Sequence, residues 1–316
     1  MKICLIFLCF TLLTFLGNLS ALSQVYNLQV MDAVEKVSLT DIYFVNQNTG
    51  YAVGDSGIIL HTTDGGSNWN RYQYADDLIL HSIYFSCPSR GWISGEKGLL
   101  LHTADAGKNW TPQTVSTSST LYKVFFADSL TGFAVGSHTL LSTSDGGTTW
   151  TENHSYPDWD FYDVQFINPD EGWVVGGSTL LHTVDGGINW SLNNLDTRAC
   201  LYGVSFIDAR NGYLVGDDAT VLRTEDGGEY WRKVYGNRPI WLNHVHFCSK
   251  DKGCCAGMTD GEYAATGVFL WTEDSGLSWQ EINCNSCLHS ACFSKPGVAW
   301  LAGANGFVAQ LNLLMR

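Results

Sequence analysis

One octapeptide, repeated six times at nearly constant spacing, constrains the fold of this 316-residue chain more than any other feature. It reads Thr, any residue, Asp, a small residue, Gly, any two residues, then Trp. The six copies end at Trp69, Trp110, Trp150, Trp190, Trp231 and Trp279. Their spacing is 40 or 41 residues and rises to 48 at the last step. Self-similarity at such a period predicts a repeat architecture.

A second motif lies upstream of each octapeptide: an aromatic residue, two small or apolar residues and Gly, as in Tyr51–Gly54. The sixth copy has Cys254 in place of the aromatic residue, and a seventh, Trp300–Gly303, follows the last octapeptide. A segment typical of a strand precedes each copy and ends in Phe44, Phe85, Phe126, Phe166, Phe206, Phe247 or Phe293. Each unit therefore reads as four short strands, which at this period indicates a β-propeller blade.

The repeats predict an all-β chain: one seven-bladed β-propeller over residues 24–316, with four-stranded antiparallel blades. The seventh unit stops after its third strand, at Phe307–Leu311, and lacks a Trp strand. The segment Val25–Met31 is extended in character and belongs to no unit of its own. We expect this N-terminal strand to complete the last blade, because closure leaves no free sheet edge.

The octapeptide is predicted to turn the chain between the third and fourth strands. Asp accepts hydrogen bonds from backbone N–H groups a residue or two onward, and Gly takes the positive-φ position. Identical residues in six blades point in six directions, so they cannot converge on one substrate. We therefore assign a structural role to Asp64, Asp105, Asp145, Asp185, Asp226 and Asp274.

The octapeptide is similar to the Asp-box of sialidase-type propellers, also called the BNR repeat. The whole unit resembles the photosystem II stability/assembly factor family, in its non-photosynthetic bacterial branch. The resemblance implies a non-enzymatic scaffold that binds protein partners, and no cofactor is expected. Photosynthetic members present an arginine-rich surface, whereas this chain has eight Arg and a net charge of −14. The resemblance therefore does not identify the partner. The acidic balance also argues against nucleic acid.

Residues 1–23 are predicted to be a secretory signal peptide. Lys2 precedes the apolar run Ile3–Gly17, and Ala21-Leu22-Ser23 forms a small-x-small cleavage site. A membrane-spanning helix is the alternative, but the run is shorter than about 18 apolar residues. We expect a bacterial protein exported to the periplasm or secreted, with no stable membrane insertion after cleavage, and a monomer.

Export changes how the cysteines are interpreted, because an oxidising compartment favours disulfides. Six of the eight cysteines left after cleavage lie beyond residue 247. Local disulfides are therefore predicted among Cys248, Cys254, Cys255, Cys284, Cys287 and Cys292. A thiolate zinc site, with Cys284–Cys287 as one pair, is the alternative, and we expect no metal.

An exo-glycosidase of sialidase type is the alternative function. Such enzymes need three arginines facing one carboxylate, and the early Arg-Ile-Pro motif is absent here. Other glycosidases need two facing carboxylates. The carboxylates outside the octapeptides show no recognisable pair; they include Asp158, Asp160, Asp163, Asp196, Asp217, Asp218, Asp260 and Glu262. We therefore predict no catalytic residues.

A partner is expected at the end of the channel opposite the Asp-boxes, where the loops differ most. Near the start of the first strand the units carry Thr40, His81, Tyr122, Tyr162, Tyr202, Asn243 and His289. These side chains either form a polar, aromatic mouth or pack between blades. The loop entering blade 4 adds Tyr156 and Trp159, which are typical interface anchors. The insertion in blade 6 adds Asp260, Glu262 and Tyr263.

Overall fold

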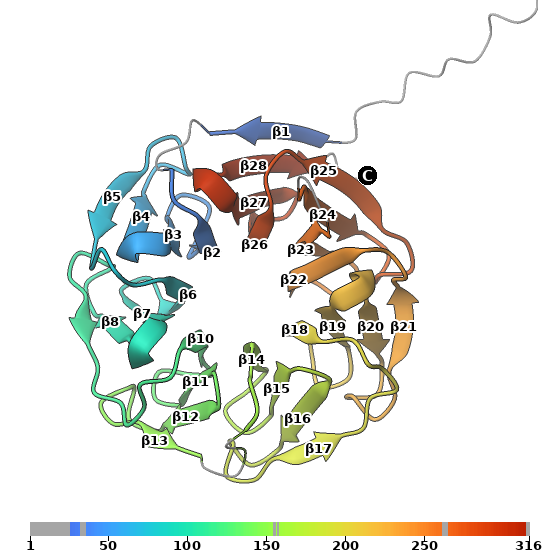
Figure 1. Cartoon of the computed structure of the whole chain (residues 1–316), viewed down its shortest axis with the longest axis horizontal. Helices are drawn as coiled ribbons and strands as arrows, with labels where there is room; N and C mark the ends of the chain where they lie inside the picture. The colour runs from blue at the N-terminus through green and yellow to red at the C-terminus, as the bar shows by residue number, and fades with distance from the viewer. Residues whose placement is uncertain (1–25, 32–35, 154–155, 157, 261–264, 314–316) are drawn as a thin grey trace, which may run out of the picture.

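Seven four-stranded antiparallel sheets surround a central channel in the computed structural model, as Figure 1 shows. The structure describes residues 26–31, 36–153, 156, 158–260 and 265–313. The arrangement confirms the predicted seven-bladed β-propeller. The predicted signal peptide, residues 1–23, and the candidates Glu262 and Tyr263 lie outside the described residues. Within the described residues, no helix has the length and apolar character needed to cross a membrane.

The blades follow one another in sequence order, and each runs from an innermost to an outermost strand. Blade 1 comprises β2 (Leu39–Phe44), β3 (Gly50–Gly54), β4 (Ile58–Thr62) and β5 (Asn70–Gln73). Blade 2 comprises β6 (Leu80–Cys87), β7 (Arg90–Gly95), β8 (Leu100–Thr103) and β9 (Thr111–Pro112). Blade 3 comprises β10 (Leu121–Phe126), β11 (Gly132–Gly136), β12 (Thr139–Thr143) and β13 (Thr151–Glu152).

The next three blades repeat this order. Blade 4 comprises β14 (Asp163–Phe166), β15 (Gly172–Gly176), β16 (Thr179–Thr183) and β17 (Ser191–Asn193). Blade 5 comprises β18 (Leu201–Phe206), β19 (Gly212–Gly216), β20 (Val221–Thr224) and β21 (Arg232–Tyr235). Blade 6 comprises β22 (Ile240–Phe247), β23 (Gly253–Thr259), β24 (Gly267–Thr272) and β25 (Gln280–Cys284).

Blade 7 joins the two ends of the chain. Its inner strands are β26 (Leu288–Lys295), β27 (Val298–Gly303) and β28 (Val308–Leu313), and its outer strand is β1 (Tyr26–Val30). β1 pairs antiparallel with β28, from Tyr26 opposite Leu313 to Val30 opposite Ala309. The predicted closure by the N-terminal strand is thus confirmed. Short 3-10 turns follow four of the second strands: η1 (Asp55–Gly57), η2 (Glu96–Gly98), η3 (Asp217–Ala219) and η4 (Ala304–Gly306).

A three-ring aromatic stack holds neighbouring blades together at six interfaces. In the interface between blades 2 and 3, Phe126 stacks on Trp92 at 3.6 Å and meets Trp150 edge-on at 5.8 Å. The motif aromatic, the strand-one Phe and the octapeptide Trp therefore form one recurring unit, and this explains why all three recur in the sequence. The interface between blades 6 and 7 differs, because Cys254 replaces the aromatic residue and blade 7 has no octapeptide.

The Asp-box turn is held by the same hydrogen bonds in all six copies. In blade 1, Asp64 Oδ1 accepts from the backbone N–H of Asn68 at 2.9 Å and from Thr62 Oγ1 at 2.9 Å. Thr62 Oγ1 in turn accepts from the N–H of Gly66 at 2.9 Å. The structural role of the six Asp residues is consistent with this geometry. The backbone donor, however, lies four residues onward instead of the one or two expected.

Close approach of the preceding blade explains the constant second Gly of the octapeptide. Gly66 has φ of +84°, and a Cβ placed on it would lie 2.1 Å from Cη2 of Trp300 in blade 7. The motif aromatic of the preceding blade occupies that space, so a side chain is excluded by both contact and backbone conformation.

The structure does not show the predicted disulfides: all eight cysteines of the described residues are free. Cys254 and Cys255 are neighbours on β23, so their side chains point to opposite faces and enter different hydrophobic cores. Cys284 shares a core with Cys254, but the two lie on either side of β24, opposite Gly267 and Trp271. Four residues of offset correspond to about 13 Å along a strand, beyond the reach of a disulfide.

Of the other three candidates, Cys292 belongs to a third hydrophobic core. Cys248 and Cys287 lie at opposite ends of the propeller, after the end of β22 and before the start of β26. The alternative of a zinc site gains no support. The described residues contain no group of three or more His, Cys, Asp or Glu side chains placed to hold a metal ion.

Candidate binding site in the central channel

The innermost strand of every blade lines the channel, and two cavities open within it. The upper cavity, of about 90 Å³, lies at the end where these strands begin; the lower cavity, of about 260 Å³, lies toward the Asp-box end. Both are bounded by four residues that we call the septum: Asp41, Lys123, Asp163 and His244. The septum therefore divides the channel, and a ligand approaching from either end meets charged groups.

The upper cavity is surrounded by the side chains expected near the start of strand one, which we call the mouth ring: Thr40, His81, Tyr122, Tyr162, Tyr202, Asn243 and His289. Centroids of successive rings lie 5.3 Å (His81–Tyr122), 5.5 Å (Tyr122–Tyr162) and 5.3 Å (Tyr162–Tyr202) apart. All these side chains are half-buried. The structure thus brings the predicted ring together as a continuous aromatic arc over blades 2 to 5.

The remaining members of the mouth ring bond to the next blade. His289 Nδ1 lies 2.9 Å from the carbonyl oxygen of Leu39, and Thr40 Oγ1 donates to the carbonyl of Leu80 at 2.5 Å. The mouth ring therefore combines the two arrangements considered from the sequence, a polar and aromatic mouth and contacts between blades. All members line the cavity, and Thr40, Asn243 and His289 also join neighbouring blades by hydrogen bonds.

Asp41 anchors the septum and links three blades. Its Oδ1 accepts from Ser290 Oγ at 2.7 Å in blade 7, and its Oδ2 accepts from the N–H of Ile83 at 3.1 Å in blade 2. Burial opposes ionisation, but the Lys123 ammonium, His244 and these hydrogen bonds outweigh it and lower the pKa of Asp41. Asp41 is therefore a buried carboxylate held in its charged form.

Lys123 supplies the matching charge from blade 3. Its Nζ lies 3.6 Å from Asp41 Oδ2, and it forms no other ion pair among the described residues. Burial would lower the pKa of Lys123, but Asp41 and Asp163 raise it. Asp163 bonds to the N–H groups of Val164 and Val204 at 2.9 and 3.0 Å, yet burial raises its pKa.

Two histidines complete the interior. His244 lines both cavities, and its Nδ1 has no hydrogen-bond partner in the described structure. Burial, with the positive charge of Lys123, lowers the pKa of His244 to about 3 and that of His246 to about 4. Both imidazoles are therefore neutral at ordinary pH, and they leave the septum with two carboxyl groups against one ammonium.

Six phenylalanine and tyrosine residues line the lower cavity, and hydrogen bonds join neighbouring blades around it. The hydroxyl of Tyr43 donates to the carbonyl of Phe85 at 3.1 Å, and that of Tyr84 donates to the carbonyl of Phe126 at 2.8 Å. Gln165 bonds to the backbone of the next blade in the same way. These side chains join innermost strands, so their polar groups are engaged by the fold.

The loop entering blade 4 lies differently from expectation. Tyr156 and Trp159 pack against each other at 5.1 Å and against the core between blades 3 and 4, where Phe161 is fully buried. The hydroxyl of Tyr156 donates to the carbonyl of Trp190 at 3.2 Å. Their aromatic surface therefore serves packing in part. Asp260, from the blade 6 insertion, is exposed, and its N–H bonds to the carbonyl of Pro239.

The sequence interpretation missed the septum. In each innermost strand, the residue directly after the mouth-ring residue lies at the level of the septum. Four blades place the septum residues Asp41, Lys123, Asp163 and His244 there, and the other three have Ser82, Gly203 or Ser290. Their placement at one repeat-equivalent position of the innermost strand was a usable signal. Asp163 was noted as an unpaired carboxylate. Because both of its oxygens, like those of Asp41, accept backbone N–H bonds, neither carboxyl stands free as an acid or base.

The repeats, the four-stranded blades and the octapeptide turns define an Asp-box β-propeller whose channel is closed by a charged septum. The sequence matches the family described as photosynthesis system II assembly factor YCF48 in three overlapping segments, residues 20–117, 110–199 and 188–297. The chain therefore belongs to this family. No curated protein matches the sequence significantly.

Solved structures of similar fold include YCF48 bound to D1 peptide, which is 18% identical with a TM-score of 0.73 over 90% of this chain and 96% of that chain. YCF48 from Cyanidioschyzon merolae is also 18% identical, with a TM-score of 0.72 over 90% of this chain and 98% of that chain. A GH74 enzyme from Niastella koreensis is 13% identical, with a TM-score of 0.70 over 90% of this chain and 53% of that chain. At these identities the likeness concerns the fold alone.

Proposed function

We propose that this protein is an exported bacterial scaffold that binds a segment of a protein partner at the mouth ring. The observation that carries the proposal is the aromatic arc of Tyr122, Tyr162 and Tyr202, which lines a cavity with a closed floor. Family membership supports a scaffold role, and one structural relative is described as bound to a peptide. Export rests on the signal-like sequence of residues 1–23.

The mouth ring suits a protein segment because its tyrosines combine an apolar face with a polar tip. The upper cavity, of about 90 Å³, has room for the end of one side chain, so the rest of a partner would lie on the surrounding loops. Unequal loops on a rigid ring are a common way for one fold to acquire a specific site. The six Asp-box turns are near-copies and offer less to distinguish one partner from another.

A non-enzymatic role is part of the proposal. The two channel carboxylates, Asp41 and Asp163, are committed to backbone N–H groups of neighbouring strands, which suits a structural role better than acid–base chemistry. Glycoside hydrolysis is the alternative that the GH74 neighbours make worth testing. A panel of chromogenic glycosides, sialosides included, should give no turnover. Turnover lost in Asp163→Asn would favour the hydrolase instead.

The direct test is selection of binders from a displayed peptide library, followed by titration of the recovered peptides against variants. Tyr162→Ala should weaken binding at least tenfold with little change in melting temperature. Ile188→Ala, at an exposed Asp-box position, is the matched control and should bind normally. If the affinity of the recovered peptides depends on Ile188 and does not change in Tyr162→Ala, the binding site lies at the Asp-box end and the proposal is wrong.

A further inference from the structure

We infer that the segment bound at the mouth ring is basic, with a Lys or Arg side chain entering the upper cavity. This inference rests on the proposed function and adds the chemistry of the partner. The features that carry it are the aromatic arc, the carboxylates placed against it, and the balance of charge around the opening.

The rings of the aromatic arc line the upper cavity. Four rings follow one another over blades 2 to 5 with centroids 5.3 to 5.5 Å apart. The faces of tyrosine rings carry negative electrostatic potential and attract a cation lying within about 6 Å of the ring centroid. Adjacent rings at this spacing can contact one ammonium or guanidinium group from more than one side.

Carboxylates lie within electrostatic reach of the same rings. Asp160 and Asp217 act on Tyr162, and Asp217 also acts on Tyr202. Oδ1 of Asp217 is inaccessible to solvent and has no hydrogen-bond partner in the described structure. Oδ1 of Asp160 is likewise without a hydrogen bond, and His138 Nε2 lies 3.8 Å from it. A ligand cation beside Tyr162 would lie within electrostatic reach of both carboxylates.

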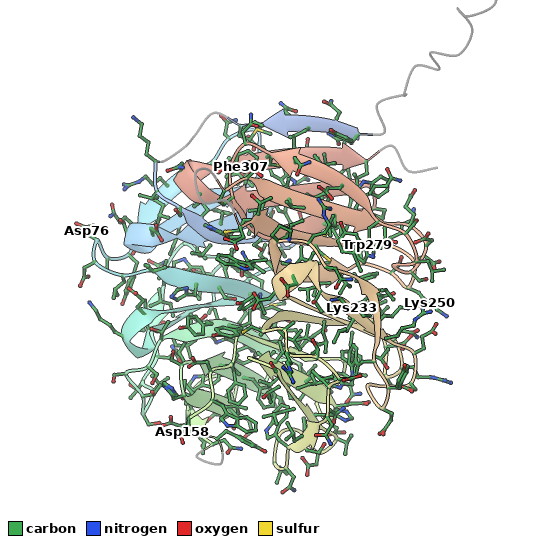
Figure 2. The ribbon with its side chains drawn as sticks, turned by 45° about the vertical axis from the view of Figure 1, so that its right-hand side comes forward. Asp76, Asp158, Lys233, Lys250, Trp279 and Phe307 are labelled. Carbon is green, nitrogen blue, oxygen red and sulfur yellow. The ribbon has the colours of Figure 1, made fainter. Side chains whose placement is uncertain are left out.

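Loops at this end of the propeller carry more acidic than basic residues. The described acidic residues there are Asp55, Asp76, Asp77, Glu96, Asp158, Asp160, Asp196, Asp217, Asp218 and Asp260. The described basic residues are Lys36, Lys97, Arg198 and Arg238. Lys97 pairs with Asp77 at 2.8 Å, and Arg238 pairs with Glu281, so these two charges are already matched. Figure 2 shows Asp76 and Asp158 at the periphery of the molecule.

The floor of the cavity disfavours an anionic ligand. Asp41 neutralises Lys123 at 3.6 Å, and Asp163 adds a further carboxyl group to the same septum. An entering carboxylate would face Asp163 with no free cation to bind. A wholly apolar side chain would gain no electrostatic attraction from Asp160 and Asp217. A cationic side chain satisfies both the rings and the carboxylates.

The test uses three fluorescein-labelled decapeptides of Gly and Ser that carry two central Lys, two Glu or two Ala residues. Anisotropy titrations at low salt should show the Lys peptide binding at least tenfold more tightly than the other two. Added salt should weaken that binding, because the attraction is electrostatic. Asp217→Asn should reduce the affinity for the Lys peptide about fivefold. Glu229→Gln, the same charge change at an exposed Asp-box position, should change it less than twofold.

The outcomes separate the two proposals. If library-selected peptides bind through Tyr162 but are neutral or acidic, the mouth site stands and the basic preference is wrong. If no peptide of any charge depends on Tyr162, both proposals fail. Equal loss of Lys-peptide binding in Asp217→Asn and Glu229→Gln would mean that only the overall negative charge is sensed, and would overturn a specific basic site.

Discussion

Lys123 Nζ lies 3.6 Å from Asp41 Oδ2, and this ion pair joins blade 3 to blade 1 across the channel. It passes over blade 2, whose innermost strand contributes the small Ser82 at the same level. Most inter-blade contacts in this propeller link immediate neighbours. The ion pair therefore adds a constraint of a different kind, because it links two blades that are not neighbours in the ring.

Replacing Lys123 with Met should destabilise the fold by about 3 kcal/mol, because it leaves the buried Asp41 carboxylate without its counter-charge. The free energy of unfolding from urea titrations measures the effect. Lys97→Met is the matched control: it removes another Lys–Asp pair, at 2.8 Å, whose side chains are 64% and 76% exposed. That change should cost less than about 1 kcal/mol. Equal effects of the two changes would show that the septum pair contributes no more to the free energy of unfolding than an exposed ion pair does.

Much of the fold could be predicted from the sequence, because each blade repeats the same three anchors. The strand-one Phe, the motif aromatic and the octapeptide Trp meet in one stack, so the period itself reports the architecture. The closing strand followed from counting strands in the last unit. The shared repeat position of the septum residues indicates their common level in the channel, but it does not predict which of them pair. Asp41 and Lys123 are ordinary polar residues in their own strands, and their pairing depends on the geometry of the closed ring.

The candidate site, too, could be predicted from the sequence only in part. The mouth ring followed from equivalent positions in the repeat. Trp159 was expected to be free for binding because its neighbours are polar, yet it packs on Tyr156 and the adjacent core. The burial of Trp159 depends on how its loop lies against the core between blades 3 and 4, and no local sequence pattern encodes that placement. The disulfide prediction relied on nearness in sequence, yet the neighbours Cys254 and Cys255 point to opposite faces of one strand and enter different cores.

The two interior histidines should make stability fall as the pH drops below about 6.5. Their folded pKa values, about 3 for His244 and about 4 for His246, lie below the unfolded value, so the unfolded state binds more protons between these limits. Stability is therefore lost on acidification through this window, with a slope up to about 1.4 kcal/mol per pH unit for each group.

The double variant His244→Gln/His246→Gln should flatten the dependence of unfolding free energy on pH between 6.5 and 4, relative to the unsubstituted protein. Removal of the exposed His138 by His138→Gln provides the control. A double variant with an unchanged pH profile would show that these imidazoles titrate alike in the folded and unfolded chain.

Gly66→Ala should cost about 3 kcal/mol of stability, since the added Cβ would lie 2.1 Å from Trp300 and the backbone φ is +84°. Gly177→Ala is the comparison, because Gly177 also has positive φ, +54°, but no atom lies within 4 Å of its Cβ position. Only backbone strain should act there, at about 1 kcal/mol. Thermal and urea unfolding of the two variants measure the difference. Similar losses would show that the ring contact is unimportant.

The cysteines should titrate as free thiols. The denatured protein should yield as many reactive thiols without reductant as after reduction. In the folded state the exposed Cys87 should react first, because hydrogen bonding to Ser89 lowers its pKa. The buried Cys254 should react only on unfolding, since burial raises its pKa. Fewer thiols in denaturant before reduction than after it would restore the disulfide prediction.

Deleting residues 26–31 should open the ring. β1 supplies the outer strand of blade 7 through five antiparallel pairs with β28, and Leu28 packs on the core that blades 6 and 7 share. Without β1, β28 becomes an unpaired edge with free backbone groups and a newly exposed apolar side, which is a template for association with another chain. The truncated protein should melt at a lower temperature and form oligomers or aggregates that grow with concentration, as light scattering would detect.

Replacing residues 26–31 with a Gly/Ser segment of equal length should act like the deletion, because the loss lies in strand pairing and side-chain packing. Asn27→Ala, at an exposed position of β1, should remain close to the unsubstituted protein. A truncated chain that stays monomeric with an unchanged melting temperature would show that the ring closes without its N-terminal strand.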